Sequence, residues 1–232
     1  MDNYIILKAQ GLYKSYPTMA GKLDVLQGVD LEVKSGEMIA VVGASGVGKS
    51  TLLHILGTLD RPDSGKVTIN DKEVFSLDDK ILANFRNRTI GFVFQFHHLL
   101  PEFTCQENLI IPKLIAGEKK EQAMQKASEL LQEIGLKNRM FHRPLELSGG
   151  EQQRLAVARA LVNSPQVVLA DEPSGNLDQK SAESLMELLV NLNKNKKQTF
   201  IIATHNLKLS KIADRIFEMR EGKVFLNNNL NN

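Results

Sequence analysis

The chain has 232 residues, 42% of them hydrophobic and 24% charged, and its 29 basic and 27 acidic side chains give a formal net charge of +2. This length suffices for one well-buried core. The nearly equal numbers of basic and acidic side chains do not favour a nucleic-acid-binding protein. The single cysteine, Cys105, excludes an intramolecular disulfide, and no apolar run approaches the roughly 18 to 20 residues that span a bilayer, so we expect a chain that stays in the cytosol.

The first predicted elements are strands. Between residues 25 and 33 valine and leucine recur with a period of two around Gly28, which is typical of a half-buried strand. Such alternation is common in antiparallel sheets that expose one face. We therefore expect an antiparallel β unit in the N-terminal part of the chain.

A continuous apolar run at residues 38–42 predicts a buried strand, and residues 50–59 predict a helix after it. The segment between them fits the P-loop pattern, in which glycines let backbone N–H groups turn toward phosphate oxygens at a helix N-terminus. Lys49 would then reach the β and γ phosphates of ATP, and Ser50 would bind Mg²⁺. The predicted phosphate-binding residues are Gly43, Ala44, Ser45, Gly46, Val47, Gly48, Lys49, Ser50 and Thr51.

Two alternatives bear on this loop. A glycine-rich turn could merely join strand to helix, but its glycines cost stability and an unpaired lysine in a tight turn offsets none of that cost. P-loops also occur in kinases and GTPases, although the guanine-reading pattern Asn-Lys-x-Asp is absent from the sequence. The loop alone predicts a phosphate site and leaves the reaction open.

The middle of the chain is helix-rich from residue 78 to residue 143, and apolar residues at helical spacing within 118–134 predict an inserted helical region. Beyond it, residues 167–170 and 199–203 predict two further buried strands, with a helix at 181–192 between them. Strand, helix, strand in this order implies a parallel α/β sheet.

Polar residues follow the last two of these strands. Asp171 and Glu172 end the first one, and His205 comes just after the second. Ligands bind at the carboxyl edge of a parallel sheet, so we expect Asp171 to hold Mg²⁺ and Glu172 to act as general base for the attacking water. His205 would contact the γ phosphate and steady that water. The alternative is an acidic turn that caps the next helix.

Residues 147–154, Leu-Ser-Gly-Gly-Glu-Gln-Gln-Arg, precede an apolar-periodic helix and resemble the signature of the ABC ATPase family. Ser148, Gly149, Gly150 and Gln152 would form a second anion site at a helix start. About one hundred residues separate this segment from the P-loop. We therefore expect a head-to-tail homodimer in which the P-loop of one copy and the signature of the other enclose a shared ATP.

The resemblance implies further site residues. Tyr16 is similar to the aromatic that stacks on adenine, with Tyr13 as a nearby competitor. Gln95 resembles the glutamine that touches Mg²⁺ and senses the membrane partner, although a surface glutamine is the simpler alternative. Residues 175–178 resemble the loop that crosses the dimer interface, with Asp178 near the nucleotide, and a turn that starts the next helix is compatible with that role.

The family resemblance covers nearly the whole chain and implies a P-loop NTPase (RecA-like) fold. Its parts are a parallel sheet core, an N-terminal antiparallel β subdomain and an inserted α-helical subdomain. We predict a single ABC ATPase domain over residues 1–232. The core with the β subdomain would occupy about 1–80 and 160–232, and the helical subdomain with the signature 81–159.

Residues 95–104, 107–109 and 170–178 resemble the lipoprotein-releasing, LolD-like branch of the family, whose subgroup also holds MacB-like exporters and FtsE-like division ATPases. The resemblance implies two copies beneath two LolC/LolE-like integral membrane subunits, peripheral to the cytoplasmic face of a bacterial inner membrane. The ATPase itself would not touch the cargo.

Residues 96–108 would form the groove that receives a membrane subunit, or would simply pack the helical region. Two residues depart from the common family pattern, Ser174 for threonine and Asn206 for aspartate. Neither removes a proposed catalytic atom. A MacB-like or FtsE-like function, and a non-transport ATPase of cofactor assembly, stay open as alternatives.

Overall fold

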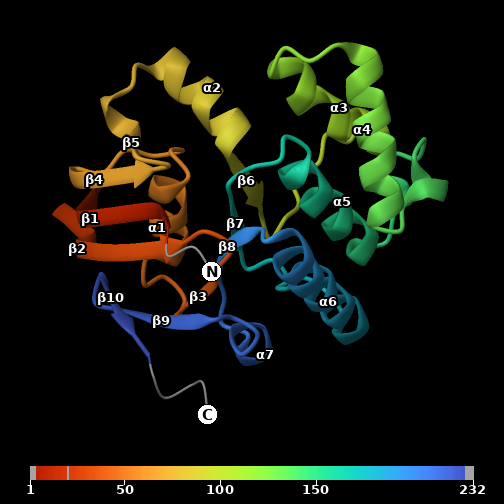
Figure 1. Ribbon diagram of the computed structural model, residues 1–232. Coiled ribbons are helices and arrows are strands. Elements are labelled where there is room, and N and C mark those ends of the chain that lie inside the picture. Colours follow the sequence, from red (N-terminus) through yellow and green to blue (C-terminus); the bar gives the residue numbers. More distant parts are fainter. Residues whose placement is uncertain (1–3, 20, 228–232) are drawn as a thin grey trace.

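The computed structural model describes residues 4–19 and 21–227, which fold into two sheets and a helical region (Figure 1). The first sheet is antiparallel, with the spatial order β2-β1-β4-β5. Its strands are β1 (Ile5–Thr18), β2 (Gly21–Lys34), β4 (Ser64–Ile69) and β5 (Lys72–Glu73). Val29, Leu31 and Val33 of β2 are buried and the residues between them are exposed, which confirms the predicted antiparallel β unit.

The second sheet has the order β10-β9-β3-β8-β7-β6, and all its strands run parallel except the edge strand β10. These strands are β3 (Met38–Val42), β6 (Ile90–Val93), β7 (Val167–Asp171), β8 (Thr199–Ala203), β9 (Arg215–Arg220) and β10 (Lys223–Leu226). The predicted strands at 38–42 and 199–203 have these bounds. The strand predicted at 167–170 is one residue longer and ends at Asp171. Because these strands pair in parallel, the predicted parallel α/β sheet is confirmed.

Seven α-helices lie among the described residues: α1 (Lys49–Leu56), α2 (Asp79–Thr89), α3 (Cys105–Ile115), α4 (Lys120–Glu133), α5 (Gly149–Leu161), α6 (Gln179–Lys196) and α7 (Leu207–Ser210). The first helix is shorter than the predicted 50–59. Gly57 is its C-cap, and Thr58 adopts a left-handed φ of 60°, which a helix cannot contain. No helix in the described ranges has the length and apolar character needed to cross a membrane.

The region from 78 to 143, predicted to be helix-rich, contains α2, α3 and α4 and also one strand that was not predicted. β6 pairs in parallel with β7 and forms an edge of the core sheet. Ile90 and Val93 are buried, but four residues carry too little periodicity to be distinguished from a turn of helix. The boundary placed at residue 81 between core and helical subdomain stays a prediction.

Alternate residues of the central strands pack into two different cores. Ile39, Leu169 and Ile201 face α1 and the antiparallel sheet. Met38, Val168 and Phe200 face the other side and pack with α5 and α6. Both faces of the sheet are therefore covered, which explains why these strands are uninterrupted apolar runs.

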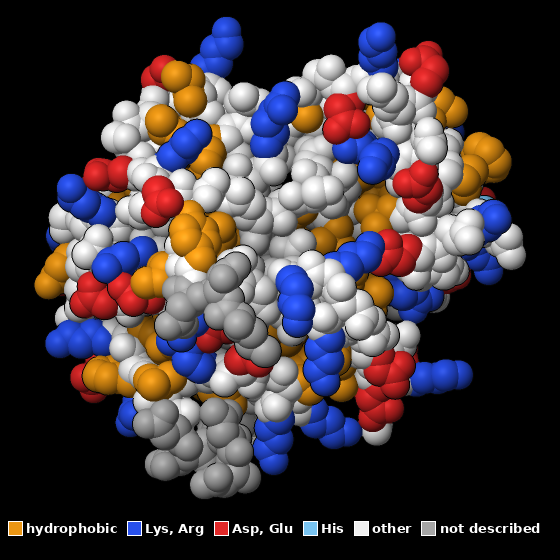
Figure 2. All heavy atoms as spheres, in the orientation of Figure 1, with side chains coloured by type: hydrophobic (Ala, Val, Ile, Leu, Met, Phe, Trp, Pro, Cys, Tyr) orange, Lys and Arg blue, Asp and Glu red, His pale blue; other side chains and the backbone are white. Residues whose placement is uncertain are grey.

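The helical region has a core of its own, built from α3, α4 and part of α5. Cys105 lies in it, fully buried, and burial raises the pKa of its thiol to about 11. Helix α5 contributes to this helical core and to a core of the sheet: Leu155 packs toward α3 and α4, and Val157 packs toward the sheet. On the surface, acidic and basic side chains are interspersed over the face in Figure 2.

Candidate nucleotide-binding site

The P-loop joins the carboxyl end of β3 to the start of α1. Gly46 (φ 78°) and Gly48 (φ 111°) take left-handed conformations that favour glycine, and Gly48 is the N-cap of α1. The first turn of α1 has no acidic side chain, so the positive end of its dipole stays available to an anion. Lys49 is only 8% exposed, and its Nζ donates to the carbonyls of Gly43 and Ala44 at 2.9 and 3.0 Å.

The three predicted catalytic residues lie together: Glu172 and His205 follow the ends of β7 and β8, and Lys49 is the first residue of α1. His205 Nδ1 is 2.9 Å from Glu172 Oε1, and the His205 backbone N–H donates to Oε2 at 3.3 Å. Lys49 Nζ lies 3.9 Å from the same Oε1. Glu172 has a left-handed φ of 44°, which is costly for a non-glycine residue and turns the chain immediately after β7.

The donor set fits a magnesium ion. Asp171 Oδ1 is buried and has no hydrogen-bond partner among the described residues, although buried polar atoms are nearly always paired. Ser50 presents an exposed hydroxyl at the start of α1. In the described part of the chain no three His, Cys, Asp or Glu side chains form a metal cluster. These oxygen donors, completed by phosphate oxygens, match the ligands that Mg²⁺ prefers.

Gln95 follows β6 and contacts the loop after β7. Its Nε2 donates to Asn176 Oδ1 at 3.0 Å, and Asn176 Nδ2 donates back to the Gln95 carbonyl at 3.2 Å. A Cβ on Gly175 would stand 3.0 Å from Gln95 Nε2, so glycine is the residue that permits this approach. Sequence reasoning missed Asn176 as a partner, because the pair is 81 residues apart.

The structure separates the two candidate adenine-stacking residues. Tyr16 donates its hydroxyl to Asp60 Oδ2 at 2.7 Å and interacts with Thr51 of α1, and burial and Asp60 raise its pKa. Lys14 Nζ lies 5.0 Å from the centre of the Tyr16 ring. The Tyr13 hydroxyl instead lies over Gly28 of β2, 2.9 Å from where a Cβ would be. Tyr16 is therefore fixed beside the phosphate-binding helix, and its contact with adenine stays a prediction.

The signature segment starts α5 with a capping box. Ser148 Oγ accepts from the Glu151 N–H at 3.3 Å, and Glu151 Oε2 accepts from the Ser148 N–H at 2.9 Å. This backbone hydrogen bond holds the pKa of Glu151 low. Gln152 Nε2 donates to the carbonyls of Pro144 and Leu147, so its amide holds the preceding turn.

The loop after β7 meets the signature directly. Asp178 is the N-cap of α6 and accepts from Ser181 N and Oγ at 3.0 and 2.6 Å. A Cβ on Gly150 would lie 2.7 Å from Ser181 Oγ, and one on Gly149 would lie 3.8 Å from Leu177. Both segments therefore form one surface, and the nucleotide contacts predicted for Ser148, Gly149, Gly150, Gln152 and Asp178 stay predictions.

The two departures from the family pattern keep structural roles. Ser174 is buried within the loop between β7 and α6. The Asn206 side chain accepts from the backbone N–H groups of Lys208 and Leu209 at 2.9 and 3.3 Å, so it caps α7. An aspartate oxygen could accept the same bonds, which explains how asparagine is accommodated here.

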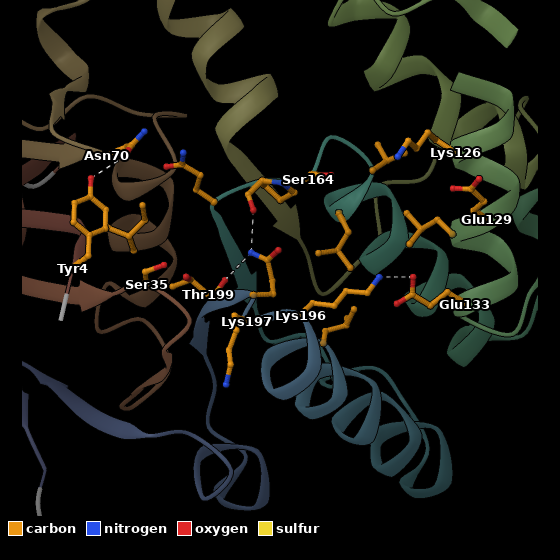
Figure 3. Close-up of a pocket in the computed structure, with 18 residues that line it drawn as sticks. Tyr4, Ser35, Asn70, Lys126, Glu129, Glu133, Ser164, Lys196, Lys197 and Thr199 are labelled. Atoms are coloured by element: carbon orange, nitrogen blue, oxygen red, sulfur yellow. Dashed lines mark hydrogen bonds and ion pairs between the residues drawn. The ribbon is translucent and has the colours of Figure 1, made fainter. Parts of the chain in front are cut away.

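A separate cavity of about 610 Å³ lies at the opposite edge of the sheet, where β7 and β8 begin (Figure 3). Thr199 and Gln166 line it at the strand starts, and Lys196 of α6 pairs with Glu133 of α4 at 2.6 Å along its wall. None of the predicted nucleotide or metal residues lines this cavity. The predicted site therefore belongs to the other edge of the sheet.

Comparison with known proteins assigns the class. The model of the ABC transporter family matches residues 26–175. The chain therefore belongs to the ABC transporter family, as the signature segment predicted. The family and the P-loop site together define an ATPase whose hydrolysis is coupled to transport.

Curated relatives refine this class. The chain is 53% identical over 219 residues to the lipoprotein-releasing system ATP-binding protein LolD of Cytophaga hutchinsonii, covering 94% of this chain and 98% of that protein. It is 54% identical to LolD of Geobacter metallireducens, covering 94% and 97%, and 50% identical to LolD of Porphyromonas gingivalis, covering 95% and 99%. The predicted LolD-like branch is confirmed.

Solved structures confirm the predicted P-loop NTPase fold. The ATP-binding cassette MJ0796, a dimer in a post-hydrolysis state bound to ADP and Pi, matches with a TM-score of 0.86 and 37% identity, covering 94% of this chain and 96% of that chain. CbiO1 of Clostridium perfringens, part of the ABC transporter complex CbiONQ, matches with a TM-score of 0.85 and 30% identity, covering 98% and 89%.

Proposed function

We propose that this chain is the ATP-hydrolysing subunit of a lipoprotein-releasing ABC transporter. The observation that carries this proposal is the cluster of Lys49, Glu172 and His205, which the fold assembles from the start of α1 and from the segments after β7 and β8. The relatives that are about 50% identical across nearly the whole chain supply the cargo class, because their names specify lipoprotein release.

The geometry supports a division of labour among these side chains. Glu172 is the general base that accepts a proton from the attacking water. His205 holds the Glu172 carboxylate through its ring and backbone nitrogens and would contact the γ phosphate. Lys49, released from the P-loop carbonyls, would neutralise the β and γ phosphates. Mg²⁺ held by Ser50, Asp171 and Gln95 would supply the remaining positive charge.

The proposed working unit is a head-to-tail homodimer. Ser148 starts α5 on a different part of the chain from the P-loop, so the second anion site would serve the nucleotide bound by the partner copy. The dimeric MJ0796 cassette, 38% identical to this chain with a TM-score of 0.87, supports this arrangement. Two nucleotides would then hold two chains together.

The proposed membrane partners are two integral subunits of LolC/LolE type, with the ATPases on the cytoplasmic face of the inner membrane. Phe96 is 71% exposed next to Gln95, and the exposed side chains Leu100 and Phe103 follow in the same segment. A cavity of about 420 Å³ between α2, β6 and α3 includes in its lining Phe94, two residues before Phe96, and the exposed Ile115. This apolar surface is suited to binding an amphipathic segment of a membrane subunit.

The test replaces the proposed base. Glu172→Gln keeps the size of the side chain but cannot accept the proton, so we expect the rate of ATP hydrolysis to fall at least about 100-fold. ATP affinity should be retained, and the variant should form an ATP-dependent dimer in sedimentation. Reconstituted with LolC/LolE-type subunits in proteoliposomes, it should bind lipoprotein without releasing it.

Glu187→Gln is the matched control, since Glu187 is exposed on α6 outside the site. That control should hydrolyse ATP and release lipoprotein at the parental rate. Hydrolysis by Glu172→Gln near the parental rate would contradict the base assignment. Parental ATPase activity with no lipoprotein release by the reconstituted parent complex would contradict the cargo assignment.

A further inference from the structure

The loop after β6 has an unusual backbone. His97 and His98 both take left-handed conformations, with φ values of 56° and 48°. Two consecutive non-glycine residues in this region are costly and persist only where their surroundings hold them. The loop carries Gln95 on one side and the exposed Phe96 beside it, so its shape determines where both side chains lie.

The residues that hold this loop come from α5. Arg159 Nη2 donates to the His97 carbonyl at 2.7 Å, and its Nη1 donates to the His98 carbonyl. The guanidinium is half-buried, and desolvation, with no contribution from a neighbouring carboxylate in the described ranges, lowers its pKa. Its charge is therefore satisfied chiefly by two carbonyls of one turn, a fork that fits the planar guanidinium.

Gln153 holds the other end of the same loop. Its side chain is completely buried, its Nε2 donates to the Phe94 carbonyl at 3.4 Å, and its Oε1 contacts His97 Nδ1. Helix α5 lies between the sheet and helices α3 and α4 (Figure 1) and begins at Ser148. Two side chains of the signature helix thus fix the backbone on both sides of Gln95.

We propose that Gln153 and Arg159 are positioning residues that lock the Gln95 loop to the signature helix, so that the loop and Ser148 move as one piece. Arg159 also lines the cavity between α2, β6 and α3, which the proposed function assigns to a membrane subunit. A partner bound there would contact Arg159, and so would act directly on this lock between the Gln95 loop and α5. The inference rests on the proposed function, because only in a dimer do Gln95 and Ser148 of one chain serve different nucleotides.

Arg159→Lys tests the lock. An ammonium can reach one of the two carbonyls but cannot span both, so the loop loses its fixed shape while a positive charge remains. We expect kcat for ATP hydrolysis to fall about tenfold, because displaced groups at a reaction centre cost rate steeply. The KM for ATP should stay within about twofold, since the P-loop is built on β3 and α1.

Arg88→Lys is the matched control. Arg88 on α2 also donates to a backbone carbonyl, that of Ala116, and it lies outside the site and the lock. Gln153→Met is the second variant, which keeps the length of the side chain and removes its polar atoms. It should lower kcat in the same way, and it carries the test if Arg159→Lys fails to fold.

The same changes in the Glu172→Gln background separate this inference from the proposed function. We expect ATP-dependent dimerisation to weaken about tenfold in sedimentation when Arg159→Lys is added, with the nucleotide affinity of one chain unchanged. A Glu172→Gln parent that stays monomeric with ATP overturns the dimer and the lock together. If the Glu172→Gln parent dimerises with ATP, but Arg159→Lys and Gln153→Met keep the parental kcat and the parental dimer affinity, the lock alone is overturned.

Discussion

At the scale of single residues, the chemistry of the site depends on a few backbone positions that place polar groups accurately. Glu172 occupies a left-handed turn immediately after β7, which points the chain back toward His205 and the P-loop. Asp171, one residue earlier, keeps a buried oxygen that has no hydrogen-bond partner within residues 4–19 and 21–227. Adjacent carboxylates therefore have different surroundings and can take different roles.

Cys105 gives a prediction at this scale. Only the thiolate form of cysteine is nucleophilic, and burial raises the pKa of Cys105 to about 11, so at pH 8 the thiol is almost wholly protonated. We expect iodoacetamide to leave the native chain unmodified at pH 8 and to modify it rapidly in denaturant. Mass spectrometry of the intact chain measures both. Rapid modification without denaturant would show that the thiol is accessible and ionised.

At the scale of elements, motif residues and ordinary helix signals coincide. Ser148 and Asp178 both cap the helices that follow them, and both belong to segments predicted to meet a nucleotide. For residues 175–178, the alternative of a helix-starting turn and the interface prediction are therefore compatible. A cap can keep its helix in place and still offer the helix N-terminus to an anion.

Ser148→Ala separates the two roles. Removing an N-cap hydroxyl costs about 1 kcal/mol of stability. Asp78 caps α2 by accepting from the Ile81 N–H at 2.9 Å, outside the site, so Asp78→Ala is the matched control. We expect similar losses in the free energy of unfolding by urea denaturation, and a fall in ATPase activity for Ser148→Ala alone. Equal ATPase activity in both variants would leave Ser148 with a capping role only.

Sequence reasoning located the candidate site most readily where its residues are contiguous. The P-loop, the strand-end carboxylates and the signature were found because each is a short pattern next to a clear strand or helix. β6 was missed because its four residues are too few to show periodicity. The pairings of Gln95 with Asn176, and of Arg159 with the His97 carbonyl, join residues 81 and 62 positions apart, which no local pattern reveals.

At the scale of the whole molecule, helix α1, which follows the P-loop, and strand β6, which leads to Gln95, are in direct contact. A Cβ on Gly57, at the end of α1, would lie 1.9 Å from the ring of Phe92 in β6. That ring is stacked on Phe94 with 5.5 Å between centres, so its displacement would disturb this stacking. The contact joins two separate parts of the site through the core.

Gly57→Ala tests this contact. The added methyl group must displace the Phe92 ring, and overpacking of this kind costs about 1 to 3 kcal/mol. We expect that loss in urea denaturation, together with reduced ATPase activity. Adding Phe92→Leu should restore much of the stability, because the smaller side chain makes room for the methyl group. Parental stability of Gly57→Ala alone would show that the ring moves freely.

The burial of the only cysteine has a practical consequence for measuring distances between parts of the chain. Since Cys105 lies inside the helical core, a thiol introduced on the surface would be the sole site that takes up a spin label or a fluorophore. Labels placed on α4 and on α6 would report the distance between the helical region and the sheet in the otherwise native chain. Any change in that distance when ATP is added can therefore be followed without first building a cysteine-free variant.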